Sequence, residues 1–312
     1  MASMVIYFAK ININSHIHKV YENGNEEKYR ILNLLYASMK NDVSYTKHFS
    51  WEDIEKDDIY EKDIEFKFSS LDKFGDAVIV GNVVRTSDLF VTQINPDDNS
   101  ANKIPVKNSE IIQFYFDSNK EIVAFYTTQR FKYREFEETF ERLVNECMKR
   151  EYKEKYHFEV SLLSKPTNFV DFQEQLKKQK GVSELRFEVV PPNANDEYIN
   201  NVIENGEVKL EELKDGNITK KSIVFTSKAP NGLNLSSDFF NREFDEMNAV
   251  YKTLTDNAKT DKGYVRGLAT LLNGKKVTTK DKGLYTRKTD EKNKSKGIFM
   301  EICKDFVSSL FS

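Results

Sequence analysis

The chain has 312 residues, of which 39% are apolar and 31% are charged, and its formal net charge is -3. Its 23 phenylalanines and 15 tyrosines supply enough material for a core, which excludes a disordered chain. Its two cysteines exclude a disulfide framework and a cysteine-rich zinc site. Because a single hydrophobic core stops growing at about 250–300 residues, we expect two domains, at residues 4–153 and 154–312, and one large α+β unit is the alternative.

Apolar runs in the sequence are short. None approaches the roughly 20 residues that a membrane-spanning helix needs, and the first residues lack the pattern of a secretion signal. We therefore expect a cytoplasmic protein without membrane insertion.

The first half of the chain has a strand-rich centre. β-Branched and aromatic residues predict strands at 4–14, 64–69 and 76–95, the last range holding two runs. A helix is expected from Asn25, which offers an N-cap, to about Met39. Strands at 111–116 and 122–128 flank a short polar turn and predict a hairpin. Apolar residues at helical spacing then predict an amphipathic helix over 133–153.

In the second half, predicted strands alternate with predicted helices. Strands are expected at 157–163, 184–190, 222–227, 264–272 and 275–279, and helices at 168–179, from Asp196, at 236–258 and at 298–311. Asn273-Gly274 joins the last two strands in a hairpin. This order predicts an α+β fold with mixed or antiparallel sheets and helices packed on one face.

Positive charge collects near the carboxyl end. Between Lys259 and Lys296 there are twelve Lys or Arg and four acids, mostly on the predicted hairpin and the loop after it. A basic β-ribbon can enter a nucleic-acid groove or follow its phosphates. The candidate nucleic-acid contacts are Lys262, Tyr264, Arg266, Lys275, Lys276, Lys280, Lys282, Arg287 and Lys288. The alternative interpretation is a solvated hairpin whose lysines keep the protein soluble.

Negative charge collects between Glu52 and Glu65, and it allows an enzymatic alternative. Glu65 and Lys67 have the E-x-K spacing that places both side chains on one face of a strand. With an upstream acid such as Asp58, they would form the site of a metal-dependent nuclease. The same residues equally fit an exposed acidic segment, which could also meet the basic hairpin of a second copy in a homo-oligomer.

Other catalytic and metal-binding patterns are missing from the sequence. His16 and His18 have no further ligand type nearby, and the sequence contains no nucleotide-binding glycine loop, nucleophile elbow or zinc-protease motif. We therefore expect no cofactor and no metal site, and we favour a binding role over catalysis.

Three segments resemble a family of bacterial proteins. They are the run Val182 to Asp196, the strand 222–227 followed by Asn231 to Leu235, and the segment Lys262 to Gly267. The family, a domain of unknown function, occurs on prophages and in defence islands. In its order of elements the chain is also similar to the DNA-binding RexA-type exclusion proteins and to the KwaB component of the Kiwa system.

The resemblance implies a role in phage defence or prophage biology. Together with the basic hairpin it predicts non-catalytic binding of nucleic acid, with DNA favoured. It also leaves open a protein-interaction or sensor module that binds a phage protein or a partner defence protein.

Overall fold

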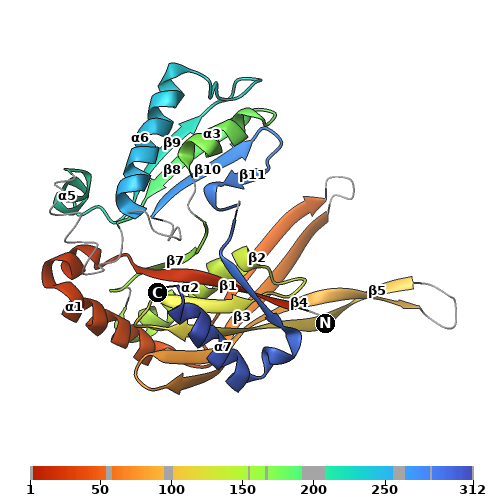
Figure 1. Ribbon diagram of the computed structural model, residues 1–312. Coiled ribbons are helices and arrows are strands. Elements are labelled where there is room, and N and C mark those ends of the chain that lie inside the picture. Colours follow the sequence, from red (N-terminus) through yellow and green to blue (C-terminus); the bar gives the residue numbers. More distant parts are fainter. Residues whose placement is uncertain are drawn as a thin grey trace. The chain divides into compact units, whose positions relative to one another are not determined.

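The structure is a computed structural model that describes residues 3–53, 58–94, 101–153, 155–165, 168–191, 208–255, 264–281 and 283–310. The fold is α+β, and its paired strands are antiparallel. One sheet has the strand order β12-β1-β6-β5-β4-β3-β2, with β7 also pairing with β1, and the other has the order β11-β10-β8-β9 (Figure 1). None of the described helices is long and apolar enough to cross a membrane.

Two compact units divide the chain. Unit 1 comprises residues 1–6, 33–155 and 288–312, and unit 2 comprises residues 7–32 and 156–287. The expected division near residue 154 coincides with one of these boundaries. Residues 7–32 and 288–312, however, belong to the units opposite to those expected, because β1 pairs with β7 and because the last helix packs on strands β5 and β6.

Unit 1 is built on long antiparallel strands. They are β2 (Ser44–Asp53), β3 (Asp58–Phe74), β4 (Val78–Ile94), β5 (Ala101–Asp117) and β6 (Ile122–Tyr126). Each pairs with the next in sequence, so the order is that of a meander. The strand residues alternate, so that Phe66 and Phe68 are buried while Glu65 between them is exposed.

Two helices cover opposite faces of this sheet at β5 and β6. On α2 (Tyr133–Tyr152), Phe136 stacks on Phe125 of β6, with ring centroids 3.7 Å apart. The next residue of β6, Tyr126, points the other way and meets Phe299 of α7 (Lys296–Ser308). Phe140 is central to the α2 side, because its ring contacts those of Phe68, Phe114, Phe116 and Phe136.

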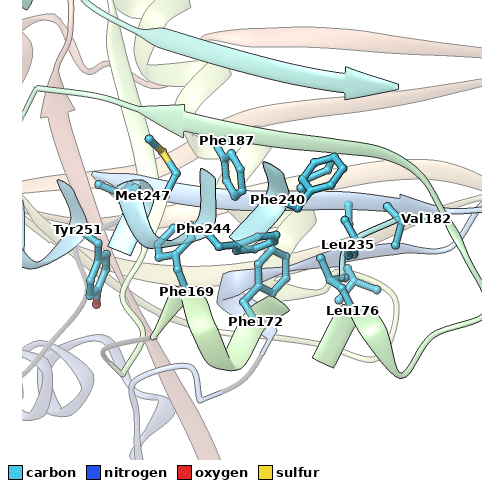
Figure 2. Packing of buried hydrophobic residues seen from close by; sticks show 14 of the residues in the cluster. Phe169, Phe172, Leu176, Val182, Phe187, Leu235, Phe240, Phe244, Met247 and Tyr251 are labelled. Carbon is cyan, nitrogen blue, oxygen red and sulfur yellow. The ribbon is translucent and has the colours of Figure 1, made fainter. Parts of the chain in front are cut away.

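Unit 2 contains the four-stranded sheet. Its strands are β8 (Val182–Val189), β9 (Lys221–Thr226), β10 (Val265–Leu271) and β11 (Lys276–Thr278). Helices α3 (Phe169–Lys177) and α6 (Asp238–Thr255) lie on one face of it (Figure 1). Phe187 of β8 meets Phe169 of α3 and Phe244 of α6 in the core that they share (Figure 2). The other face carries Glu184, Arg186 and Arg266, which are only partly buried.

Strand β1 (Ser3–Ile13) pairs antiparallel with strand β7 (Phe158–Leu162), and the paired residues belong to unit 2. The remaining elements are α1 (Ile17–Ser38), α5 (Val208–Asp215), the 3₁₀ turn η1 (Thr279–Asp281), β12 (Thr286–Asp290) and the 3₁₀ turn η2 (Glu291–Lys294).

Several elements differ from the sequence-based expectation. Helix α1 begins at Ile17 instead of Asn25, because the buried side chains of Ile17 and Val20 stabilise an earlier helical turn. Within α1, Gly24 has non-helical backbone angles. The range 76–95 holds one continuous strand, β4. Strands β2 and β12 and helix α5 were not predicted, and the start of the helix expected from Asp196 lies outside the described residues.

Candidate functional site

The described basic residues between Lys259 and Lys296, which include the candidate nucleic-acid contacts, separate into three groups in the structure. The first group consists of exposed side chains on two elements. On the β10–β11 hairpin, Lys275 and Lys276 are exposed. On β12, Arg287 and Lys288 are exposed as well. Within the described part of the chain, none of these four side chains has an acidic partner within ion-pair distance. These four side chains therefore carry positive charge that no described acidic side chain compensates.

A second group of cations is neutralised. In η2, Lys294 pairs with Glu291 at 2.7 Å, and Lys292 pairs with Asp290 at 3.4 Å. At the start of α7, Lys296 pairs with Asp72 of β3. These lysines contribute little net charge to a surface that would bind a polyanion.

A third group points inward. Arg266 of β10 and Lys280 of η1 both donate to the hydroxyl of Ser161 on β7, at 2.6 and 2.7 Å. Their two nitrogens therefore lie no more than about 5.3 Å apart. The turn η1 is held next to β10 because the Gly267 amide donates to Thr279 Oγ1 at 3.2 Å.

Tyr264 also departs from its predicted place. Its side chain was expected between basic residues on the surface, but Tyr264 is only 4% exposed and belongs to the apolar core of unit 2. Its ring is not available for stacking on a base. Lys262 and Lys282 lie outside the described residues.

Polar residues of β1 and β7 face the inward-pointing cations. In the β1–β7 ladder Lys10 is opposite Ser161, and Asn12 is opposite Glu159. Because side chains two positions apart project to the same face of a strand, all four share one face. All four are buried. We define the Ser161 cluster as Lys10, Asn12, Glu159, Ser161, Arg266 and Lys280, all of which belong to unit 2.

Carboxylates balance part of the positive charge. Glu159 lies 3.7 Å from Arg266 and 3.7 Å from Lys220, which precedes β9. Lys220 also reaches Glu188 of β8 at 3.3 Å, and Arg186 lies 3.9 Å from the same carboxylate. An extended network of alternating charge therefore links β7, β8 and β10.

Three buried polar atoms in the Ser161 cluster have no hydrogen-bond partner among the residues that the structure describes. They are the amide nitrogen and the amide oxygen of Asn12 and the Oε2 oxygen of Glu159. Asn12 is only 1% exposed, so bulk water does not solvate its amide. A buried polar group without a partner costs about 1–3 kcal/mol, and such groups are few in folded proteins. The Asn12 amide thus has an unused donor and acceptor, whereas Glu159 Oε2 lies 3.7 Å from the Arg266 guanidinium.

The sequence carried a signal for this cluster that the prediction missed. The strand 4–14 was interpreted from its apolar residues alone, although Lys10 and Asn12 interrupt them with period two. Glu159 and Ser161 repeat that pattern. Polar residues at alternate positions of a strand indicate that one face meets either solvent or a buried polar site. Because both faces of these two strands are buried here, the structure has a buried polar site.

The residues of the nuclease alternative lie on the solvent side of β3. Glu65 and Lys67 share a strand face, and the residues paired with Glu65 are the neutral Thr46 and Thr86. The side chain of Asp58 is outside the described part of the structure. Among the described residues no group of three or more His, Cys, Asp or Glu side chains could hold a metal ion. Among the described residues, the structure therefore adds no further metal ligand to Glu65 for the nuclease alternative.

Both cysteine thiols are buried. Burial raises the pKa of Cys147 to about 11, and it also raises the pKa of Cys303. We expect neither thiol to react with a disulfide reagent such as Ellman's reagent in native protein at pH 8, because the thiolate is the reacting form. Both should react after denaturation. A fast reaction of two thiols in the native protein would contradict this assignment.

No family model matches the chain, and a search of the curated proteins finds no match either.

Proposed function

We propose that the protein binds nucleic acid, preferentially DNA, without cutting it, and that it does so in phage defence or prophage biology. The supporting observation is a set of exposed cations that have no acidic partner among the described residues, Lys275 and Lys276 on the β10–β11 hairpin and Arg287 and Lys288 on β12. The biological setting rests on the resemblance of sequence segments alone.

The physical basis is neutralisation of phosphates. Lysine and arginine side chains that contact phosphates release condensed counterions, which gives affinity that falls as salt rises. A lysine already paired with a carboxylate releases fewer counterions, so the four unpaired side chains are the most effective contacts. The hairpin can present its lysines closely because Gly274, at φ +78°, closes a tight turn next to them.

The test is the salt dependence of binding. In the double variant Lys275→Gln/Lys276→Gln, we expect the slope of log affinity against log salt to fall in magnitude by about 2, since each phosphate contact contributes about 1. Affinity for a DNA duplex at low salt should fall at least about tenfold. Fluorescence anisotropy with a labelled duplex at several salt concentrations measures both quantities.

The matched control makes the same change in net charge at paired lysines. Lys40 pairs with Glu151, and Lys177 pairs with Glu174 at 2.9 Å. The variant Lys40→Gln/Lys177→Gln should leave the slope unchanged. An equal loss in both double variants, or no loss in either, would reject the hairpin as the contact.

A further inference from the structure

We propose that strand β9 pairs antiparallel with β9 of a second copy of the chain, so that the four-stranded sheets of two copies join across a two-fold axis at Val224. This inference does not depend on the proposed function, because β9 carries none of the cations assigned to nucleic acid. All the residues that support it belong to unit 2.

The outer edge of β9 is unpaired in the part of the chain that the structure describes. β9 is the last strand in the order β11-β10-β8-β9, and it pairs there only with β8. The Ser227 amide donates to the backbone oxygen of Ser183 at 2.8 Å, so the odd-numbered residues of β9 direct their backbone groups toward β8. The residues between them, Ser222, Val224 and Thr226, therefore direct their N–H and C=O groups away from the sheet, where a further strand can pair with them.

The other three terminal strands of the two strand orders carry charges, which hinder the pairing of sheet edges between molecules. β2 contains Lys47, β11 begins with Lys276, and β12 contains Arg287. In β9 the only charged residue is Lys221, the first residue of the strand, and residues 222–226 are uncharged. The uncharged outer edge of β9 therefore favours pairing with another strand.

Apolar side chains are accessible along this edge on both faces of the sheet. Val224, on the face away from α3 and α6, is 46% exposed. On the face that the helices cover, Ile223 and Phe225 pack against the core of unit 2 but are only partly buried. Phe239 at the start of α6 lies beside Phe225, with ring centroids 5.5 Å apart, and is 45% exposed. An added strand would remove part of this apolar area from water, which favours the pairing.

The sequence of β9 is complementary to itself about Val224. In an antiparallel pair, residues that direct their backbone groups toward the partner strand are opposite each other. An axis at Val224 therefore places Ser222 opposite Thr226 of the partner subunit, which brings two hydroxyl side chains together. It also places Ile223 opposite Phe225 of the partner subunit, and a β-branched residue opposite an aromatic ring is a favourable cross-strand pair. These matches identify a second copy of the chain as the partner.

Charges at the ends of β9 confine the pairing to the strand. In this register Lys221 is opposite the neutral Ser227 of the partner subunit. Lys220 would be opposite Lys228, but both lie beyond β9, and Lys220 already pairs with Glu188 at 3.3 Å. A strand pair this short buries less than the roughly 1,200–2,000 Å² of a standard protein interface. We therefore expect a reversible dimer whose fraction rises with protein concentration.

Disulfide cross-linking is the first experiment, and the native thiols of Cys147 and Cys303 do not interfere because both are buried. In Val224→Cys the two introduced side chains would be directly opposite, with Cα atoms about 5.5 Å apart, which is within the range of a disulfide. We expect a covalent dimer on a non-reducing gel after mild oxidation. Val170→Cys, at an exposed position of α3 in the same unit, should stay monomeric. Equal cross-linking of both variants, or none in Val224→Cys, overturns the proposal.

A mixture of two variants tests the register. Ser222→Cys and Thr226→Cys should each cross-link poorly alone, because identical positions would lie about 14 Å apart along the paired strands, beyond the reach of a disulfide. Oxidation of both variants together should give the mixed dimer, since Ser222 and Thr226 are opposite each other in the proposed register. A mixture that forms no more mixed dimer than dimers of either variant overturns the axis at Val224.

The last experiment measures the dimer without a cross-link. Val224→Lys places two like charges opposite each other on the axis and should raise the dissociation constant at least about tenfold. Val170→Lys makes the same change in charge on α3 and should leave it unaltered. Sedimentation velocity over a range of concentrations measures the dimer fraction, and circular dichroism checks that both variants fold. A wild-type protein that stays monomeric throughout, or a Val224→Lys variant that dimerises like the wild type, overturns the proposal.

Discussion

Gly232→Ala is expected to lower the free energy of unfolding by about 3 kcal/mol or more, since it combines backbone strain with a steric clash. Gly232 has φ +73°, in the left-handed region that favours glycine, and an added Cβ would lie 2.3 Å from the backbone oxygen of Val182. The same oxygen accepts a hydrogen bond from the Leu233 amide at 2.7 Å. Relief of the clash would therefore pull the turn at Gly232 away from the start of β8.

Gly274→Ala is the matched control for this prediction. Gly274 also has a positive φ, +78°, but nothing lies within 4 Å of an added Cβ. Its substitution should cost only the left-handed conformation, about 1–2 kcal/mol. Urea denaturation of both variants measures the difference, and equal losses would show that the contact with β8 is not rigid.

Phe140→Ala is expected to lower stability by about 3–5 kcal/mol, the usual cost of removing a buried aromatic ring. Phe140 is fully buried, and its ring contacts those of Phe68, Phe114, Phe116 and Phe136, so the cavity would be lined by large side chains that cannot all close on it. Thermal and urea unfolding measure the loss.

Phe49→Ala serves as the control in the same unit. Phe49 is 39% exposed on β2, and its replacement should cost about 1 kcal/mol or less. A loss for Phe140→Ala as small as that for Phe49→Ala would contradict the packing of α2 on the sheet. Because Gly232 and Phe140 belong to different units, the two test variants should shift different transitions if the units unfold separately.

Local sequence patterns predicted most of the helices and strands, because these elements are formed by residues that are close in sequence. The amphipathic spacing of Phe136, Phe140 and Leu143 predicted α2 to within a residue of its observed end, and Asn273-Gly274 predicted the β10–β11 hairpin. The N-cap pattern at Asn25 gave the wrong start for α1, because the buried side chains of Ile17 and Val20 stabilise helical turns before Asn25. Tertiary burial outweighed the local capping preference there.

The candidate site was harder to predict because it depends on contacts between distant residues. Arg266 and Ser161 are 105 positions apart, and Lys280 and Ser161 are 119 positions apart. Charge counting along the chain grouped Arg266 and Lys280 with exposed lysines, although strand alternation turns Arg266 away from the helices and onto β7. Composition cannot distinguish a cation that faces solvent from one that faces a buried hydroxyl.

The last segment of the chain has a consequence for synthesis. Residues 288–312 belong to unit 1, and Phe299, Cys303 and Val307 of α7 are buried there. A ribosome must therefore release the residues of α7, up to Ser308, before unit 1 can pack this helix, whereas unit 2 has all of its parts once residue 287 has emerged. A nascent chain stalled before α7 would leave apolar sheet surface uncovered, and we expect chaperone dependence to be greatest at that stage.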